Sequence, residues 1–448
     1  MTTLTIRGGR VIDPGTDLDA IADVVVVDGR IERVGADAGA GVEAERVLDA
    51  SGLVVAPGFV DLHVHLREPG QEHKETIASG TRAAAAGGFT TICAMPNTEP
   101  PMDTAGLVEA TRANASAVVR VLSVGCISMG RLGVELAPVA ELVDAGVVAL
   151  SDDGDFVADA GLMRKAFEYA AMWDLPLSQH CEEPALVGNG QMHEGWVSAR
   201  LGLAGRPASA EIAAVARDIA LAEQTGGHLH VQHLSTARAV ELVAEARARG
   251  IQVTAEVTPH HLTLNHEVVA FGVGGNPEDE VLRYDSDAKC NPPLREPDDV
   301  AACVEGLRSG VIDCIATDHA PHAPHEKEVE FDRAPAGMIG LETAFALGMR
   351  LVEAGAIDMA TLVERLTLGP VRAWGLEART GLSGLGTLSL GAAADIVVID
   401  PGARWTVSAE GLQSQSRNTP LLGETLTGQV LATVYGGAIV HEAGGITV

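Results

Sequence analysis

Residues 59–95 read FVDLHVHLREPGQEHKETIASGTRAAAAGGFTTICAM and carry the unit from which the fold can be predicted. The run FVDLHVH (59–65) predicts a first strand, and TTICAM (90–95) predicts a second. Between them lies an alanine-rich helical stretch that ends at Gly87 and Gly88, a common way to terminate a helix. Short strands that alternate with helices are typical of a parallel sheet.

The same unit recurs along the chain. The eight predicted strands are FVDLHVH (59–65), TTICAM (90–95), VVRVLSV (118–124), VVAL (147–150), LPLSQH (175–180), HLHVQH (228–233), IQVTAEV (251–257) and VIDCIAT (311–317). Eight strand–helix units predict a (β/α)₈ barrel, the TIM-barrel class of α/β fold, which we place at residues 57–375.

The two flanks of the chain have a different pattern. Residues 4–13 and 22–35 are β-rich, and Asp28-Gly29 between apolar runs is a hairpin signal. Residues 386–401 and 428–440 repeat this pattern at the other end. We therefore predict that residues 1–56 and 376–448 fold together as one small β-sandwich domain.

Composition excludes several classes of partner. The formal net charge is −30, with 61 acidic and 31 basic residues, so a nucleic-acid backbone or an anionic membrane would be repelled. No signal-like apolar segment or membrane-spanning run is visible, and we expect a cytoplasmic protein. The six cysteines form no CxxC pair, which argues against a disulfide framework and a cysteine zinc site.

Potential metal ligands follow five of the eight predicted strands. Catalytic groups of such barrels lie at the carboxyl ends of the strands, so these side chains should meet at one mouth. A His-x-His pair alone is more often incidental, and the joint placement is what supports the prediction. Imidazole and carboxylate donors suit Zn²⁺, and we predict one or two ions per chain. The candidate ligands are His63, His65, Asp153, His180, His233 and Asp318.

Other polar residues near these strand ends suggest roles in catalysis and substrate binding. Asp318 could move a proton between water and a leaving nitrogen, although an aspartate there could also simply cap the next segment. Arg67 could hold a substrate carboxylate in a bidentate fork, with Asn97 and His322 as further donors. Each of these three could equally be an ordinary loop residue.

Several motifs together carry a family resemblance. They are PGFVDLHVHLREPG, AMPNT, LSDDGDF, QHCEE, VQHLST, VTPHHL, KCNPPLR, ATDHAPH and GMIGLET, which run from Pro57 to Thr343, with GAAADIVVID in the flank. The chain resembles the amidohydrolase superfamily and, within it, the bacterial type I dihydroorotases. The motif HLREPG, combined with MPNT and TDHAPH, is far more specific than His-x-His alone.

The resemblance implies a reaction and roles for individual residues. The reaction is the reversible, zinc-dependent hydrolysis of dihydroorotate to carbamoyl aspartate in pyrimidine synthesis, with Asp318 as general acid and base. The six candidate ligands would form the metal site, and Arg67, Asn97 and His322 would hold the substrate carboxylate. Asn291 and backbone groups near Met338 would also contact the substrate.

One departure from the wider superfamily concerns the bridge between two metals. Hydantoinases and many relatives use a carboxylated lysine after the fourth strand, where this chain reads SDDGD. The nearest following lysine, Lys165, lies in a predicted helix. The resemblance therefore implies that Asp153 takes the bridging place, with Asp152 and Asp155 as close alternatives.

Two alternative functions remain open from the sequence. The chain could be another cyclic amidase, such as a hydantoinase or an allantoinase. It could instead be a catalytically silent, dihydroorotase-like subunit that serves as a scaffold for aspartate transcarbamoylase. Homo-oligomerisation is also left open, as is whether residues 321–338 form a mobile lid or an ordered wall.

Overall fold

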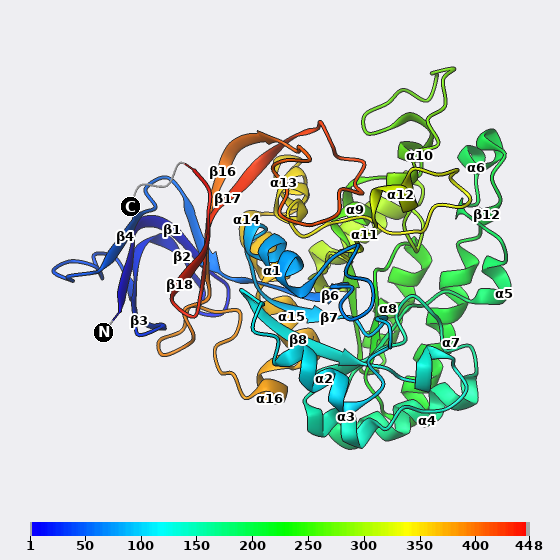
Figure 1. Ribbon diagram of the computed structural model, residues 1–448, viewed down its shortest axis with the longest axis horizontal. Helices are drawn as coiled ribbons and strands as arrows, with labels where there is room; N and C mark the ends of the chain where they lie inside the picture. The colour runs from blue at the N-terminus through cyan, green and yellow to red at the C-terminus, as the bar shows by residue number, and fades with distance from the viewer. Residues whose placement is uncertain (1, 445–448) are drawn as a thin grey trace.

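The computed structural model describes residues 2–444 and confirms the predicted fold class (Figure 1). A parallel barrel with surrounding helices forms the larger part of the molecule. A smaller sheet, built from the blue N-terminal and red C-terminal strands, lies at one side of the barrel. The described residues begin and end at this smaller sheet.

All eight predicted barrel strands are present. They are β6 (Phe59–Val64), β7 (Phe89–Ala94), β8 (Arg120–Gly125), β9 (Ala149–Leu150), β10 (Leu177–Gln179), β13 (Leu229–Val231), β14 (Val253–Val257) and β15 (Cys314–Ile315). They pair in chain order, and each described pairing is parallel. The His65 amide donates to the His319 carbonyl at 2.9 Å, which joins the first strand to the segment after the last and closes the barrel.

Helices surround the barrel, and shorter elements form its loops. The longer helices are α1 (Ile77–Ala86), α2 (Ala105–Arg112), α3 (Val139–Ala145), α4 (Ala160–Ala170), α7 (Ser209–Thr225), α8 (Ala237–Ala248), α11 (Pro297–Ser309), α13 (Ala344–Glu353), α14 (Met359–Leu366) and α15 (Leu368–Trp374). The short helices are α5 (Pro184–Val187), α6 (Trp196–Leu201), α9 (Pro259–Thr263), α10 (Glu267–Phe271), α12 (Pro324–Lys327) and α16 (Leu376–Thr380), with the strand pair β11 (Met192–His193) and β12 (Gly205–Arg206). Gly146 ends α3 with φ at 92°, a left-handed conformation that favours glycine.

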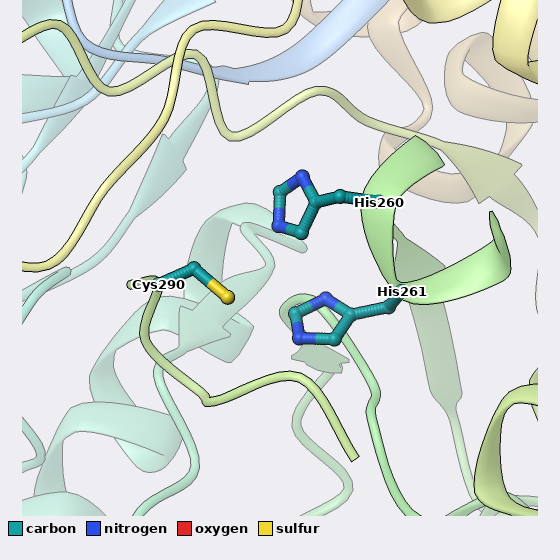
Figure 2. Close-up of side chains that lie close together, drawn as sticks. All are labelled: His260, His261 and Cys290. Carbon is teal, nitrogen blue, oxygen red and sulfur yellow. The ribbon is translucent and has the colours of Figure 1, made fainter. Parts of the chain in front are cut away.

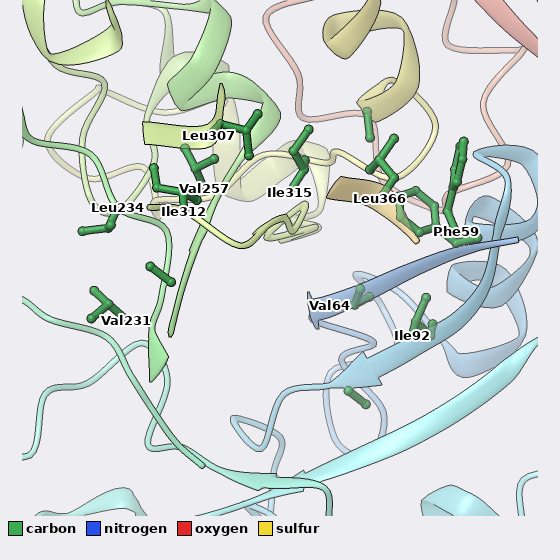
Figure 3. Close-up of a cluster of buried hydrophobic side chains, with 14 of the residues drawn as sticks. Phe59, Val64, Ile92, Val231, Leu234, Val257, Leu307, Ile312, Ile315 and Leu366 are labelled. Atoms are coloured by element: carbon green, nitrogen blue, oxygen red, sulfur yellow. The ribbon is translucent and has the colours of Figure 1, made fainter. Parts of the chain in front are cut away.

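The main apolar core lies between the barrel strands and the helices (Figure 3). Val231 and Val257 from the strands share this core with Leu307 and Leu366 from the helices. Each side chain of this size stabilises the fold by about 1.5–3 kcal/mol when fully buried. The packed layer therefore fixes the strand ends on which the polar residues stand.

Strand β6 does not pair evenly with β7 along its length. Its pairing with β7 shifts register between Asp61 and Val64. Leu62 packs in a cluster with Trp374 of α15, and Val64 packs in the main core. A strand irregularity of this kind re-aims the side chains that follow it.

The smaller sheet contains eight strands drawn from both ends of the chain. They are β1 (Thr3–Asp13), β2 (Leu18–Val27), β3 (Arg30–Gly35), β4 (Arg46–Asp49), β5 (Val54–Pro57), β16 (Ile396–Thr406), β17 (Thr425–Tyr435) and β18 (Ala438–Glu442). The order is β18-β17-β16-β5-β1-β2-β3, and β4 pairs with β1. The Asp28-Gly29 hairpin turn is confirmed, with φ of 46° and 76° at the two residues.

The sheet curls so that its far strand returns to the C-terminal half. The Ile31 amide of β3 donates to Ala392 at 3.0 Å, just before β16 begins. The apolar residues of both halves enclose one core of their own. The division of the chain at residues 56/57 and 375/376 stays a prediction.

One connection of this domain extends to the barrel. Between β16 and β17, residues 407–424 pass beside the loops at the barrel mouth, where the Ile339 amide donates to the Asn418 carbonyl at 3.0 Å. Within residues 2–444, no helix is both long and apolar enough to span a membrane.

Candidate active site

Two carboxylates and two histidines meet at the mouth of the barrel. His63 Nε2 lies 3.4 Å from Asp153 Oδ1 and 3.5 Å from Asp318 Oδ1. His65 Nε2 lies 3.3 Å from Asp153 Oδ2 and 3.0 Å from Asp318 Oδ1. All four side chains are buried, so the barrel holds their charges and lone pairs away from bulk water.

The other two predicted histidines lie beside this group. His180 Nδ1 is 2.9 Å from His233 Nε2, and both nitrogens are 3.9 Å from Asp153 Oδ1. Candidate ligand atoms of His63, Asp153 and His233 lie within 4.8 Å of one another, as do those of His63, His65 and Asp318. The six predicted ligands therefore form one cluster, with His63 common to both groups.

Three neighbouring aspartates after β9 have distinct surroundings. Asp152 accepts from the amides of Ile127 and Ser128 at 2.8 and 3.0 Å. Asp155 is exposed and pairs with Arg131 at 2.6 Å. Only Asp153 of the three points to the histidines, which supports its assignment over the two alternatives.

Lys165 lies on the exposed face of α4 and is not part of the site. This position agrees with the prediction that no lysine of the fourth unit reaches the metal ligands.

The two histidines of β6 are oriented by partners on other strands. Glu256 of β14 accepts a hydrogen bond from His63 Nδ1 at 2.6 Å, and its second oxygen lies 3.1 Å from His230 Nε2. Asn97 Oδ1 lies 2.8 Å from His65 Nδ1. In both histidines these contacts leave Nε2 directed at the carboxylates, the arrangement in which a second partner fixes a metal-ligating imidazole.

The electrostatics of the cluster favour a bound cation. Burial would lower the pKa of His63, but Asp153, Asp318 and Glu256 hold that pKa well above its usual range. Burial, with His180 and His63 beside it, holds the pKa of His233 well below its usual range. The cluster therefore places three carboxylates around His63, together with a neutral imidazole at His233 that can act as a ligand.

These residues fit a divalent metal ion. His63 Nε2 is buried and makes no hydrogen bond within residues 2–444, although two carboxylate oxygens face it. An orphaned buried nitrogen is costly unless something binds it. Imidazoles and carboxylates in this proportion are a donor set that zinc and similar ions accept.

Three residues of the site have strained backbone conformations. Arg67, His233 and Asp318 have φ values of 61°, 30° and 47°, in the region that non-glycine residues rarely adopt. Such conformations cost about 1–3 kcal/mol each and are characteristic of functional sites. The three residues follow strands β6, β13 and β15, respectively.

A cavity of about 210 Å³ opens beside the ligand cluster. It is lined by His65, Arg67, Asn97, Asp153, Gly154, His180, His233, Asn291, Asp318, Ala320, His322, Ala336 and Gly337. Of the predicted substrate-binding residues, Arg67, Asn97, Asn291 and His322 thus share one cavity with most of the predicted ligands. Met338 does not line it; its carbonyl accepts from the Ala320 amide at 2.9 Å, and its side chain is buried in an apolar cluster.

Arg67 supplies a positive group to this cavity. Its Nε donates to the Pro321 carbonyl at 3.2 Å, which orients the guanidinium. Burial lowers the pKa of Arg67 to about 10, so it remains charged at neutral pH. His322 Nε2 donates to the Ala336 carbonyl at 2.9 Å, and burial and Arg67 lower the pKa of His322 to about 2.

A second group of potential ligands consists of His260, His261 and Cys290, and Cys290 precedes Asn291 in the chain (Figure 2). His260 and His261 of α9 face Cys290. Both nitrogens of His261 are used, because Nδ1 lies 2.8 Å from Thr258 Oγ1 and Nε2 lies 3.1 Å from the Pro292 carbonyl. We therefore interpret His261 as an anchor of the 290–292 segment, which presents Asn291 to the cavity.

Sequence reasoning missed two contributors to the site. Glu256 lies inside the predicted strand IQVTAEV, where a lone glutamate in an apolar run was a signal of a buried polar role. Asn418 comes from the small domain and contacts the loop after β15. No local pattern marks Asn418, since its partners are 81 to 98 residues away.

The fold is that of the cyclic amidohydrolase barrels. The L-hydantoinase (dihydropyrimidinase) of Arthrobacter aurescens superposes with a TM-score of 0.85 at 26% identity, covering 100% of this chain and 98% of that one. The dihydropyrimidinase of Brevibacillus agri shares the fold, with a TM-score of 0.82 at 24% identity and coverage of 98% and 95%.

Sequence comparison narrows this class. A family model described as dihydro-orotase-like matches residues 52–239. Proteins named dihydroorotase from Anaeromyxobacter dehalogenans and Geotalea daltonii are 53% and 48% identical to the chain. The matches cover 98% of this chain in both cases, and 98% and 99% of the relatives. The chain belongs to the dihydroorotase family.

Proposed function

We propose that the protein hydrolyses the cyclic amide of dihydroorotate reversibly, with N-carbamoyl-L-aspartate as the open product, in pyrimidine synthesis. The observation that carries this proposal is the position of Arg67 in the same cavity as the ligand cluster. A guanidinium is suited to bind a carboxylate, and dihydroorotate carries one beside its ring amide.

We further propose Zn²⁺ as the metal, one or two ions per chain. His63, His65, Asp153, His180, His233 and Asp318 would hold it. When bound, the ion would polarise the ring carbonyl and lower the pKa of a neighbouring water. The residues of the chain then supply orientation and proton transfer.

Arg67 and Asn291 would orient the substrate, with the carboxylate toward the guanidinium and the ring toward the ligand cluster. Both side chains line the cavity and have a partner there: Arg67 Nε donates to the Pro321 carbonyl at 3.2 Å, and Asn291 Nδ2 lies 3.1 Å from His180 Nε2. Holding a reactant in one orientation removes much of the entropic barrier to reaction. A ring without the carboxylate would lose this restraint.

Asp318 would carry the proton. It would accept a proton from water as the water oxygen forms a bond to the ring carbonyl carbon, and would then donate it to the ring nitrogen as the carbon–nitrogen bond breaks. Burial would raise the pKa of Asp318, but His63 and His65 hold it below its usual value, so the carboxylate begins as a base.

A comparison of substrates tests the proposal. Purified, zinc-supplemented protein should hydrolyse dihydroorotate with a higher kcat/KM than hydantoin or allantoin. A preference for hydantoin or allantoin would make the protein a different cyclic amidase. No turnover of any of the three, together with stable binding to aspartate transcarbamoylase, would indicate a scaffold subunit instead.

A further inference from the structure

The small domain contributes one buried side chain to the barrel mouth. Asn418, in the connection between β16 and β17, is only 3% exposed. Its Oδ1 accepts from the His322 amide at 3.0 Å. Its Nδ2 donates to the carbonyls of Ala320 and Gly337, both at 3.0 Å. The side chain thus uses its acceptor and its donors on three separate backbone groups.

All three of these partners line the substrate cavity. The contacts to Ala320 and His322 lie on either side of Pro321, whose carbonyl accepts from Arg67 Nε. Asn418 therefore fixes the short segment that both presents His322 and orients Arg67.

Residues 335–337, on the other side of the cavity wall formed by residues 320–337, are also held closely. Gly337 has φ at 136°, and a Cβ there would lie 2.9 Å from His322 Nε2 and 2.9 Å from Ala320 Cβ. Lys327 Nζ donates to the carbonyls of Pro335 and Gly337 at 2.9 and 3.1 Å. These contacts leave little room around Gly337. If the hydrogen bonds of Asn418 were lost, a small shift of an adjacent residue could therefore not replace them.

An amide is the group that this position requires. Asparagine offers one acceptor and two donors on a short side chain, which matches one amide and two carbonyls. Aspartate would place a carboxylate oxygen against two carbonyl oxygens. Alanine would leave the buried His322 amide and Ala320 carbonyl without partners, and the Gly337 carbonyl would keep only Lys327.

We propose that Asn418 is a positioning residue of the substrate site, through which the small domain holds Arg67 and His322 in their binding geometry. The role in binding rests on the proposed function, because it assumes a substrate whose carboxylate Arg67 receives in the cavity that His322 also lines. The ordering of the wall by Asn418 does not depend on that assumption.

The test compares Asn418→Ala and Asn418→Asp with Gln413→Ala. Gln413 lies on the same connection with an exposed side chain, and its backbone amide donates to Glu342. In both Asn418 variants we expect the KM for dihydroorotate to rise by about tenfold or more, with a smaller fall in kcat and unchanged zinc content. The Gln413 variant should match the wild type. Wild-type KM in a folded Asn418 variant would overturn the proposal.

Hydrogen exchange gives a second measurement that needs no turnover. Peptides covering residues 319–339 should exchange faster in the Asn418 variants, while peptides from the barrel strands remain protected. Unchanged exchange in this segment would overturn the proposal. If the wild type does not hydrolyse dihydroorotate, the proposed function fails, and the exchange rates still decide whether Asn418 orders the wall.

Discussion

At the scale of single residues, His63 is the centre of the site. It is the one residue shared by both groups of candidate ligands, and Glu256 fixes its orientation through a 2.6 Å contact. A carboxylate behind a ligating imidazole sets both its tautomer and its basicity. The metal affinity of the proposed site should therefore depend on Glu256, which is not itself a predicted ligand.

This dependence can be measured with Glu256→Gln. The substitution keeps the shape of the side chain but removes its charge, so we expect zinc affinity to fall by about 10–100-fold. Competition with a chromogenic chelator would measure the affinity. Asp13→Asn, which alters a buried carboxylate of the small domain, is the control and should bind zinc normally. Unchanged affinity in the Glu256 variant would remove it from the metal site.

Asp318 allows binding and proton transfer to be separated. Asp318→Asn retains an oxygen near His65 but cannot accept a proton at neutral pH. We expect turnover of dihydroorotate to fall by about 10²-fold or more while most of the zinc remains bound. Metal analysis and steady-state kinetics on the same preparation would show this. Near-normal turnover would exclude Asp318 as the general acid and base.

At the scale of elements, the strand ends were predictable and their exact geometry was not. The alternation of short strands with helical stretches, and the glycines that end those helices, located all eight barrel strands. The ends of the predicted strands pointed to the histidines and Asp318 as candidate ligands. The register shift in β6 could not be predicted, because it arises from pairing with β7 rather than from local sequence. Glu256 and Asn418 were missed for a similar reason: their partners are adjacent only after the barrel closes and the small domain docks.

Residues 321–338 form an ordered wall in this structure. Lys327 is buried and bonded to two carbonyls of the segment, and Lys289 Nζ donates to the Phe331 carbonyl at 2.7 Å. Segments held by such contacts open rarely, because opening leaves buried polar groups without partners.

Limited proteolysis tests this reading of the wall. Arg333 is exposed and offers trypsin a site within the segment. We expect the wild type to resist cleavage there and Lys327→Met to be cut at least several times faster, since cleavage requires local opening. Rapid cleavage of the wild type at Arg333 would mean that the segment is a mobile lid.

At the scale of the whole molecule, buried histidines couple stability to pH. Burial lowers the pKa of His228 to about 3 and those of His193 and His261 to about 4. In the unfolded chain each would titrate near the ordinary value of about 6.5. Below that pH the unfolded state binds more protons than the folded state, so these residues lower the free energy of unfolding as pH falls.

The variant His228→Gln isolates one such contribution. Below about pH 6.5 the wild type should lose stability relative to the variant by up to about 1.4 kcal/mol per pH unit. Urea unfolding of metal-free protein between pH 7.5 and 5.5 would measure the difference. The wild type must be compared with the variant because Asp218 also titrates in this range. Burial raises the pKa of Asp218 to about 6, so this residue increases the free energy of unfolding as pH falls. Parallel pH profiles for the two proteins would contradict the prediction.

In the proposed function, the cavity receives a cyclic amide that bears a carboxylate, and Arg67 recognises this group. Dihydrouracil is the same ring without the carboxylate, so the ratio of kcat/KM for dihydroorotate over dihydrouracil measures that recognition directly. We predict a ratio of about 10³ or more for the wild type, as expected for a site built around a charged partner, and a collapse of the ratio in Arg67→Ala. A ratio near one in the wild type, or an unchanged ratio in the variant, would contradict recognition of the substrate carboxylate by Arg67.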